Sequence, residues 1–212
     1  MYNHCKECKG KKECNQPLVG FVNGVRCRFN QRGTYNTTEL LKSKYERFSC
    51  DNVQEIIQHI NTYHSIYLWG PYGLGKTHET YWLANKYNLQ GHDVFVILAA
   101  DIREQLIKEI QLNKSTGEIP HSIRQTMKDV ELLFIDDVGN EQMTDFVHDC
   151  VQSVIDYRYR NELPTFITSN YPIPELYKTY TNQIGEYKAG QIVSRMKKFG
   201  VVEIKGKNWR NE

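Results

Sequence analysis

The chain has 212 residues, of which 40% are hydrophobic and 25% charged, with a formal net charge of +2. This composition is ordinary for a soluble globular protein, and the length suits one substantial core or one core with a small appendage. The longest apolar run, residues 94–100, is far too short to span a bilayer. Cys and Lys stand where a secretory signal needs apolar residues, so no membrane contact and a cytoplasmic location are predicted.

Basic residues and cysteines are concentrated near the N-terminus. Residues 1–47 carry ten Lys and Arg against four Asp and Glu, whereas residues 48–212 are net acidic. Such a basic segment suits contact with nucleic acid or with an acidic partner surface, although a solvated face has the same composition. Four of the six cysteines fall within the first 27 residues. In a cytosolic chain, clustered cysteines bind metal more often than they form disulfides.

The four N-terminal cysteines can supply the ligands of one tetrahedral zinc ion. Cys5 and Cys8 have the Cys-x-x-Cys spacing that lets two thiolates hold the same ion. Cys14 and Cys27 are more widely spaced than usual, so His4 is an alternative ligand. We therefore predict a structural zinc site, with unliganded thiols or an iron–sulfur cluster as the alternatives.

Three segments are predicted from these patterns. Residues 1–36 contain few aliphatic side chains and need a metal to fold, so they are predicted to form the zinc-binding domain. Residues 37–48 are expected to form a linker helix that begins at a Thr-Thr-Glu cap. Residues 49–212 are expected to form the main domain.

Helical and strand patterns alternate along the main domain. Helices are expected over residues 51–63, 76–88, 101–112, 119–128, 143–161 and 189–197, and strands over residues 65–69, 93–98, 131–135, 164–168 and 201–205. Continuously apolar strands that alternate with helices indicate a parallel sheet covered on both faces. The predicted fold class is therefore α/β, a parallel P-loop sheet flanked by helices and preceded by the small zinc domain.

The segment from Gly70 to Thr77 matches the phosphate-loop pattern Gly-x-x-x-x-Gly-Lys-Thr between a strand and a helix. Gly73 and Gly75 allow the backbone to wrap phosphate closely, and the following helix adds its positive dipole end. Lys76 supplies a positive charge to the β- and γ-phosphates, and Thr77 offers a hydroxyl to Mg²⁺. ATP or ADP is expected to contact Gly70, Pro71, Tyr72, Gly73, Leu74, Gly75, Lys76, Thr77 and His78.

Two later strands are expected to complete an ATP-hydrolysing site. The first ends in Asp136, which would hold Mg²⁺, and Asp137, which would orient or deprotonate the attacking water. The second ends in Asn170, which would hold the attacking water or touch the γ-phosphate. A turn-forming role before Tyr-Pro is the alternative for this asparagine. Lys76, Asp137 and Asn170 are therefore predicted to act in catalysis.

These motifs, in this order, resemble the Walker A, Walker B and sensor I elements of AAA+ ATPases. The finer resemblance is to the DnaC/DnaI type of bacterial helicase loader and the related IstB transposition ATPases, and it covers roughly residues 45–212. It rests on the Asp-Asp Walker B that ends in Gly139, the Thr-Ser-Asn-Tyr strand end, Ser194-Arg195-Met196, and Gly206-Lys-Asn-Trp-Arg210. Many AAA+ proteins have Glu where Asp137 stands, and the shorter acid matches the loader pattern.

The resemblance implies roles for two arginines. Arg195 takes the place of an arginine finger that reaches the γ-phosphate in a neighbouring subunit, and Arg210 takes that of sensor II in its own subunit. A finger supplied in trans can be worth ~10³–10⁵ in rate. Self-association through the ATP sites and slow, partner-stimulated hydrolysis are therefore implied. Arg158 and Arg160 are rival candidates for the finger.

The resemblance also implies an ATP-dependent loader of the hexameric replicative helicase onto single-stranded DNA in DNA replication. The short length of the chain fits a phage or mobile-element version of such a loader. The zinc-bearing segment resembles that of the DnaI variety, where this domain contacts the helicase. DNA contact is expected from Arg103, Lys108, Lys114, Arg124 and Lys128. The alternatives are an IstB-like ATPase that regulates transposition target choice, and a zinc-containing DNA-binding adaptor in which ATP is structural.

Overall fold

A computed structural model describes residues 21–22, 25–26, 64–89, 92–116 and 122–206. Within the predicted zinc domain, strands β1 (Phe21–Val22) and β2 (Val25–Arg26) pair in antiparallel fashion. The predicted linker helix and the predicted helix over residues 51–63 lie outside the described residues. Among the helices of the described ranges, none has the length and apolarity that crossing a membrane requires.

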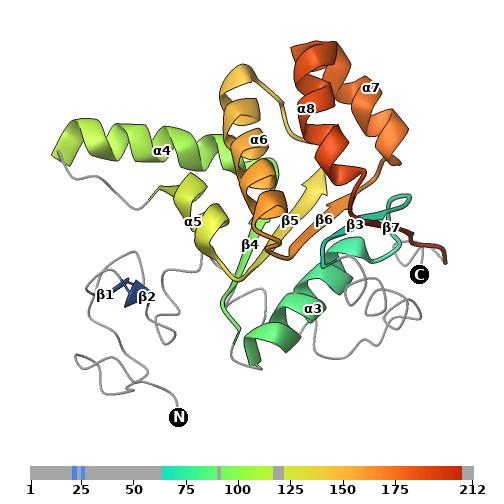
Figure 1. Ribbon diagram of the computed structural model, residues 1–212, viewed down its shortest axis with the longest axis horizontal. Coiled ribbons are helices and arrows are strands. Elements are labelled where there is room, and N and C mark those ends of the chain that lie inside the picture. Colours follow the sequence, from blue (N-terminus) through green and yellow to red (C-terminus); the bar gives the residue numbers. More distant parts are fainter. Residues whose placement is uncertain (1–20, 23–24, 27–63, 90–91, 117–121, 207–212) are drawn as a thin grey trace.

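The main domain is built on a five-stranded parallel sheet with the order β4-β5-β6-β3-β7 (Figure 1). Its strands are β3 (Ile66–Trp69), β4 (Val94–Leu98), β5 (Leu132–Val138), β6 (Thr165–Ser169) and β7 (Gly200–Glu203). Because β6 lies between β5 and β3, the carboxyl ends of these three strands meet at one edge. The predicted parallel α/β sheet is therefore confirmed.

Helices connect the strands and cover both faces of the sheet (Figure 1). They are α3 (Lys76–Leu89), α4 (Asp101–Thr116), α5 (Ile123–Asp129), α6 (Asp145–Arg160), α7 (Ile173–Ile184) and α8 (Glu186–Met196). Helix α7 was not expected from the sequence. Its buried residues Ile173, Leu176 and Tyr180 recur at helical spacing, which is the signal that could have revealed it.

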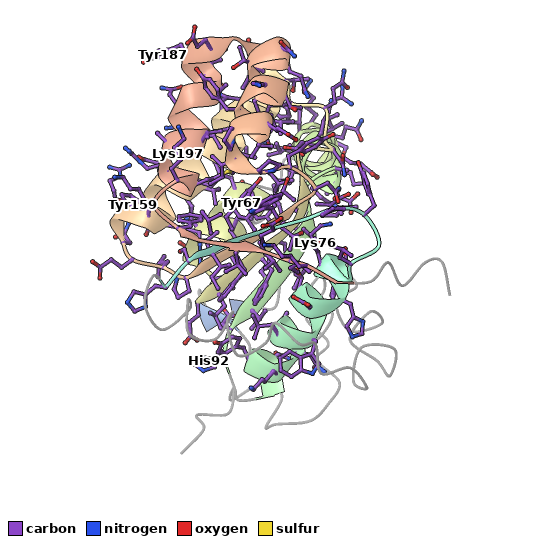
Figure 2. All side chains as sticks on the ribbon, turned by 90° about the vertical axis from the view of Figure 1, so that its right-hand side faces the viewer. Tyr67, Lys76, His92, Tyr159, Tyr187 and Lys197 are labelled. Atoms are coloured by element: carbon purple, nitrogen blue, oxygen red, sulfur yellow. The ribbon has the colours of Figure 1, made fainter. Side chains whose placement is uncertain are left out.

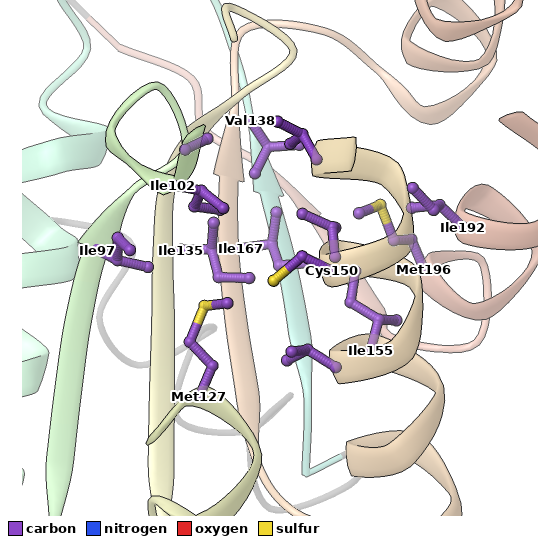
Figure 3. Close-up of a cluster of buried hydrophobic side chains, with 14 of the residues drawn as sticks. Ile97, Ile102, Met127, Ile135, Val138, Cys150, Ile155, Ile167, Ile192 and Met196 are labelled. Atoms are coloured by element: carbon purple, nitrogen blue, oxygen red, sulfur yellow. The ribbon is translucent and has the colours of Figure 1, made fainter. Parts of the chain in front are cut away.

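Alternate residues of β3, β4, β5 and β6 point into two separate cores. In β5, Leu132 and Phe134 pack on the side of α3, and Phe134 stacks on Phe166 with ring centroids 4.4 Å apart. Leu133 and Ile135 point to the opposite side. There they meet a larger cluster that includes side chains from α4, α5, α6 and α8, as Figure 3 shows. Burial on both faces explains why these strands read as continuous apolar runs.

Candidate nucleotide-binding site

The phosphate loop joins the end of β3 to the start of α3. Gly73 and Gly75 have φ angles of 83° and 84°, a region that favours glycine. A Cβ on Gly70 would lie 2.7 Å from the carbonyl oxygen of Ile204, which follows β7, so a larger residue cannot fit there. The loop is therefore a tight main-chain cradle at the N-terminus of a helix, the geometry that suits a phosphate group.

Lys76 begins α3 and is buried, with 6% of its surface exposed. Its ammonium group donates to the carbonyl oxygens of Gly70 and Pro71, at 2.7 and 2.8 Å. These bonds hold the charge inside the loop, where it would meet the phosphate groups of a nucleotide. Figure 2 shows Lys76 at the start of α3.

The end of β6 holds the end of β5 through side-chain hydrogen bonds. The Thr168 hydroxyl donates to Oδ1 of Asp136 and accepts from the main-chain N–H of Asp137, at 2.9 Å for the second bond. The Asn170 amide donates to Oδ1 of Asp137 at 2.7 Å. The Ser169 hydroxyl donates to the Val138 carbonyl at 2.6 Å. The predicted Walker B and sensor I residues therefore form one connected unit.

Asp136 and Asp137 are part of β5 instead of following it, because the strand extends to Val138. The register between β5 and β6 shifts between Ile135 and Val138, and Asp137 has a φ of 60°. This irregularity turns two consecutive aspartates in different directions. Asp136 is buried against Thr168, and Asp137 is partly exposed beside Asn170.

Asp136 and Thr77 fit the ligand set of Mg²⁺, which prefers oxygen donors. Burial raises the pKa of Asp136, whereas hydrogen bonds from Thr168 and Thr77 and the charge of Lys76 act to lower it. The contact with Thr77 brings the two predicted metal ligands together across the P-loop and Walker B. The nearby charge of a divalent cation would favour the ionised carboxylate.

A buried polar cluster next to the turn after β5 was not predicted from the sequence. Glu141 is 6% exposed, accepts from the main-chain N–H of Gly139 at 2.6 Å, and accepts from the Tyr180 hydroxyl. Tyr67 of β3 donates to the Tyr171 carbonyl at 2.7 Å. Burial raises the pKa values of Glu141, Tyr67 and Tyr180. The cluster fixes the turn that follows Walker B against α7.

Arg195, in the last turn of α8, lies toward the amino ends of the strands, away from the phosphate loop. The N–H of Gly200, just after α8, donates to the Ser65 carbonyl at 2.9 Å, so α8 ends near the start of β3. The phosphate loop begins at the opposite end of the same strand. Arg195 therefore does not join the residues around Lys76 within one subunit.

Arg158 is not available as an arginine finger, because its side chain is fully buried. It donates to Thr165 Oγ1 and to five main-chain carbonyl oxygens, those of Met127, Lys128, Val130, Glu131 and Pro164. Burial lowers the pKa of Arg158 to about 10. Its role is to join the end of α5 to the starts of β5 and β6.

Five predicted site residues lie outside the described part of the chain. These are Arg210 and the zinc candidates Cys5, Cys8, Cys14 and Cys27, and the alternative ligand His4 lies outside it as well. Their assignments therefore stay predictions.

The parallel sheet with its phosphate loop, paired aspartates and neighbouring asparagine is that of a P-loop ATP-binding domain of the AAA+ type. The chain belongs to the family of IstB-like ATP binding proteins, whose model matches residues 46–212.

Two relatives are replicative helicase loaders. The chain is 23% identical to the replicative helicase loader DnaI of Bacillus subtilis, over 98% of this chain and 79% of the relative. It is 28% identical to the replicative helicase loader DnaC of Escherichia coli, over 51% of this chain and 43% of the relative. The match to DnaC therefore spans less than half of that protein.

Solved structures support the fold assignment. A crystal structure of DnaI aligns with a TM-score of 0.59 at 23% identity, over 81% of this chain and 93% of that one. The replication initiator DnaA bound to AMPPCP and single-stranded DNA aligns with a TM-score of 0.59 at 19% identity, over 82% of this chain and 50% of that one. At these identities, the comparisons establish the shared architecture.

Proposed function

We propose that the protein is an ATPase that loads a hexameric replicative helicase onto single-stranded DNA. The observation that carries the proposal is the connected unit of Asp136, Asp137, Thr168 and Asn170 beside the phosphate loop. Similarity to DnaI over 98% of the chain supports the choice of a loader among ATP-binding proteins. A phage or mobile-element origin and a cytoplasmic location form part of the proposal.

The site residues divide the chemistry between binding and activation. Lys76 and the loop N–H groups would bind the phosphates, while Thr77 and Asp136 would hold Mg²⁺. When bound, Mg²⁺ neutralises charge that develops on the transferring phosphoryl group. Asp137 would orient the attacking water or accept its proton, and Asn170 keeps that carboxylate in place through the 2.7 Å hydrogen bond.

Arg195 would act on the nucleotide of a neighbouring subunit, because it lies away from its own phosphate loop. Figure 2 supports this geometry, since Lys76 and Tyr159, which contacts Arg195, are on opposite sides of the molecule. A guanidinium supplied in trans would couple hydrolysis to self-association. Arg210 would act as sensor II in its own subunit.

Single-stranded DNA would bind along α4. A groove of about 540 Å³ lies between α4 and the loop after β5, and Arg103 and Lys108 contribute to its lining. Lys114 lies farther along α4 and is exposed. Lys108 forms an ion pair with Glu104 at 2.6 Å, Lys128 lies over the Tyr157 ring, and Arg124 interacts with Cys150. Arg103 and Lys114 are therefore the more available of the five basic candidates. Phosphate contacts from α4 would make binding weaken with salt.

The N-terminal segment would bind the helicase. Its excess of basic residues suits an acidic partner surface, and a zinc ion held by the four cysteines would give it a fixed shape. In this arrangement one part of the chain recognises the helicase and the other reports the nucleotide state.

A helicase-capture experiment tests the proposal. The tagged full-length chain is incubated with purified replicative helicase, with and without ATP and a single-stranded oligonucleotide. Capture of the helicase and transfer to DNA that depends on ATP are expected, and both the transfer and ATP turnover are expected to be lost in Lys76→Ala.

The results also separate the alternatives. Absence of helicase capture in every nucleotide state would overturn the loader assignment. ATP-dependent binding of a transposase would then indicate the IstB-like role. ATP binding without hydrolysis in the presence of helicase and DNA would indicate the adaptor.

A further inference from the structure

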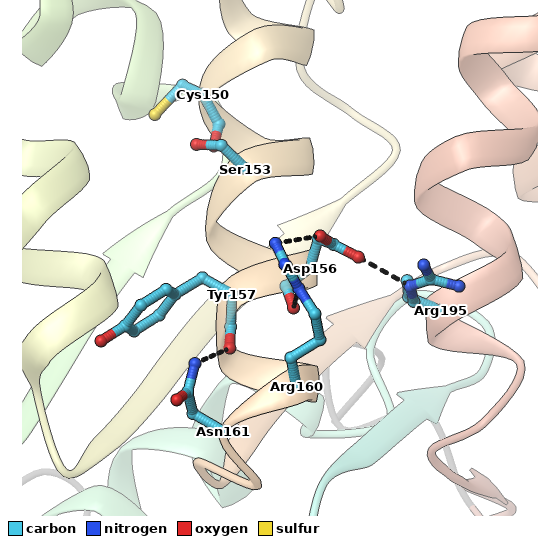
Figure 4. Close-up of polar contacts among 7 residues, drawn as sticks. All are labelled: Cys150, Ser153, Asp156, Tyr157, Arg160, Asn161 and Arg195. Carbon is cyan, nitrogen blue, oxygen red and sulfur yellow. Dashed lines mark hydrogen bonds and ion pairs between the residues drawn. The ribbon is translucent and has the colours of Figure 1, made fainter.

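Two residues of α6 hold Arg195 in a defined position. The Arg195 Nε–H donates to Oδ1 of Asp156 at 2.9 Å, and the guanidinium carbon lies 5.4 Å from the centre of the Tyr159 ring. Figure 4 shows Asp156 between Arg195 on α8 and Arg160 on its own helix. The second oxygen of Asp156 is 2.6 Å from Nη2 of Arg160. The carboxylate is therefore shared between two arginines.

These contacts leave the far side of the Arg195 guanidinium available. Asp156 engages Nε alone, whereas a two-point pairing with a carboxylate would also occupy a terminal nitrogen. Within the described part of the chain, the hydrogen bonds of the Arg195 side chain are limited to this one. The side chain is 42% exposed, against 17% for Asp156. Asp156 and Tyr159 thus orient Arg195 while both terminal nitrogens can donate to another group.

The surroundings of this arginine suit an anionic group. Tyr159, which contacts Arg195, also lines a groove of about 390 Å³. Arg160, His64 and Lys198 line it as well, with Glu162 as its acidic member. Asp156 balances only one of the two arginines that it contacts. Hydrogen bonding to Arg195 lowers the pKa of Asp156, so its carboxylate is ionised at neutral pH. The cluster keeps an excess of positive charge at the edge of the domain.

We propose that Asp156 is the positioning residue of Arg195, holding its guanidinium, with the support of Tyr159, for contact with the γ-phosphate bound by a neighbouring subunit. This inference rests on the shared ATP site of the proposed function. It adds that contacts within the same chain orient Arg195 before the subunits assemble. A flexible arginine would have to be ordered at each assembly step, which costs conformational entropy.

A mixing experiment tests the role of Asp156 in trans. A Lys76→Ala subunit lacks a working phosphate loop but can donate Arg195, and an Arg195→Ala subunit binds ATP but cannot donate the arginine. Each is expected to turn over little ATP alone, and their mixture is expected to recover activity. Asp156→Asn is then added to the Lys76→Ala donor. We expect kcat of the mixture to fall by about 10- to 100-fold, because a small displacement of a reacting group is costly.

Three readouts separate positioning from loss of structure. The KM for ATP is expected to change little, because the phosphate loop that holds the hydrolysed nucleotide belongs to the Arg195→Ala subunit, which is the same in every mixture. Asp156→Glu in the donor is expected to restore part of the activity. Asp149→Asn, a matched change on an exposed part of α6, is expected to leave the mixture as active as before. Thermal unfolding of each donor checks that it is folded.

The failures are distinguishable. One outcome is that the Lys76→Ala donor works equally well with and without Asp156→Asn, while a donor that carries both Lys76→Ala and Arg195→Ala is inactive. In that case Asp156 has no positioning role and the shared site stands. If adding Arg160→Ala to the Lys76→Ala donor abolishes activity and adding Arg195→Ala to it does not, Arg160 is the finger and the inference is overturned. If the mixture never recovers activity, the shared ATP site and this inference both fall, and helicase capture remains a separate test of the loader assignment.

Discussion

The amide of Asn170 donates a 2.7 Å hydrogen bond to the carboxylate of Asp137, across the boundary between β6 and β5. The two residues are 33 positions apart in the chain, and they meet because β5 and β6 are neighbours in the sheet. The bond fixes the one aspartate of the pair that is partly exposed at the carboxyl edge. The residue that would bind the attacking water is therefore positioned by the adjacent strand.

Replacing Asn170 by Ala should slow ATP hydrolysis much more than it weakens ATP binding. Loss of a positioned hydrogen-bond donor at a reacting centre typically costs about 10²-fold in kcat. Steady-state ATPase assays with saturating DNA and helicase measure kcat and KM separately. Asn182→Ala, on the exposed side of α7, is the matched control. An unchanged kcat in Asn170→Ala would remove Asn170 from the catalytic unit.

Gly139→Ala should distort the turn after Walker B. Gly139 has a φ of 101°, and a Cβ there would lie 2.8 Å from the Tyr171 ring and 2.9 Å from Leu176. We expect a loss of about 1–3 kcal/mol in the free energy of unfolding. Gly190→Ala in α8 is the control, because a Cβ there meets nothing within 4 Å. Urea unfolding measures both, and equal stabilities would contradict the steric role of Gly139.

Glu141 should make stability depend on pH. Its pKa is raised above the ordinary 4.5 on folding, so the folded state binds the proton more tightly than the unfolded state. The free energy of unfolding should therefore fall as pH rises from about 4.5 through the raised pKa, and should level off above it. Glu141→Gln should remove this decline.

The Glu141→Gln comparison is made by urea unfolding across that pH range. The overall stability of the variant is also expected to fall, since an amide has one carbonyl acceptor for the two bonds from Gly139 and Tyr180. Glu175→Gln, which removes one exposed negative charge from α7, corrects for the change in net charge. The same pH slope in Glu141→Gln and the parent would refute the assignment.

Arg158→Met should destabilise the domain by at least about 3 kcal/mol, because several buried carbonyl groups would lose their donor. The methionine side chain keeps part of the apolar stem but supplies no N–H group. Chemical denaturation measures the loss, and Arg103→Met on the exposed surface of α4 is the matched control. A loss of similar size in the two variants would contradict the structural role of Arg158.

The full-length chain should contain about one zinc ion, held by Cys5, Cys8, Cys14 and Cys27. Removal by a chelator should unfold the N-terminal segment while ATP binding persists, since the phosphate loop lies outside the predicted zinc domain. Elemental analysis and nucleotide titration measure the two effects. Cys5→Ser should lower the zinc content, with Cys50→Ser as the control. A metal-free chain with a folded N-terminal segment would contradict this prediction.

The burial of Arg158 and the presence of α7 were both indicated by the helical spacing of apolar residues, but neither was predicted from the sequence. Arg158 follows Val147, Val151 and Val154 at the spacing of one helix face, which places it toward the core with them. Four of its five backbone partners lie 27 to 31 positions away in the sequence, so these hydrogen bonds could not be anticipated. Helix α7 follows a strand end rich in polar residues and contains Pro174, which masked its short apolar pattern.

The sequence alone determined the phosphate loop and the alternation of strands and helices. A phosphate cradle is made from contiguous backbone, and buried parallel strands must be apolar on both faces. Only the tertiary structure placed Thr168 on Asp136, Glu141 on Tyr180, and Asp156 on Arg195. These contacts depend on which elements become neighbours, and that is decided by packing the two cores around the sheet.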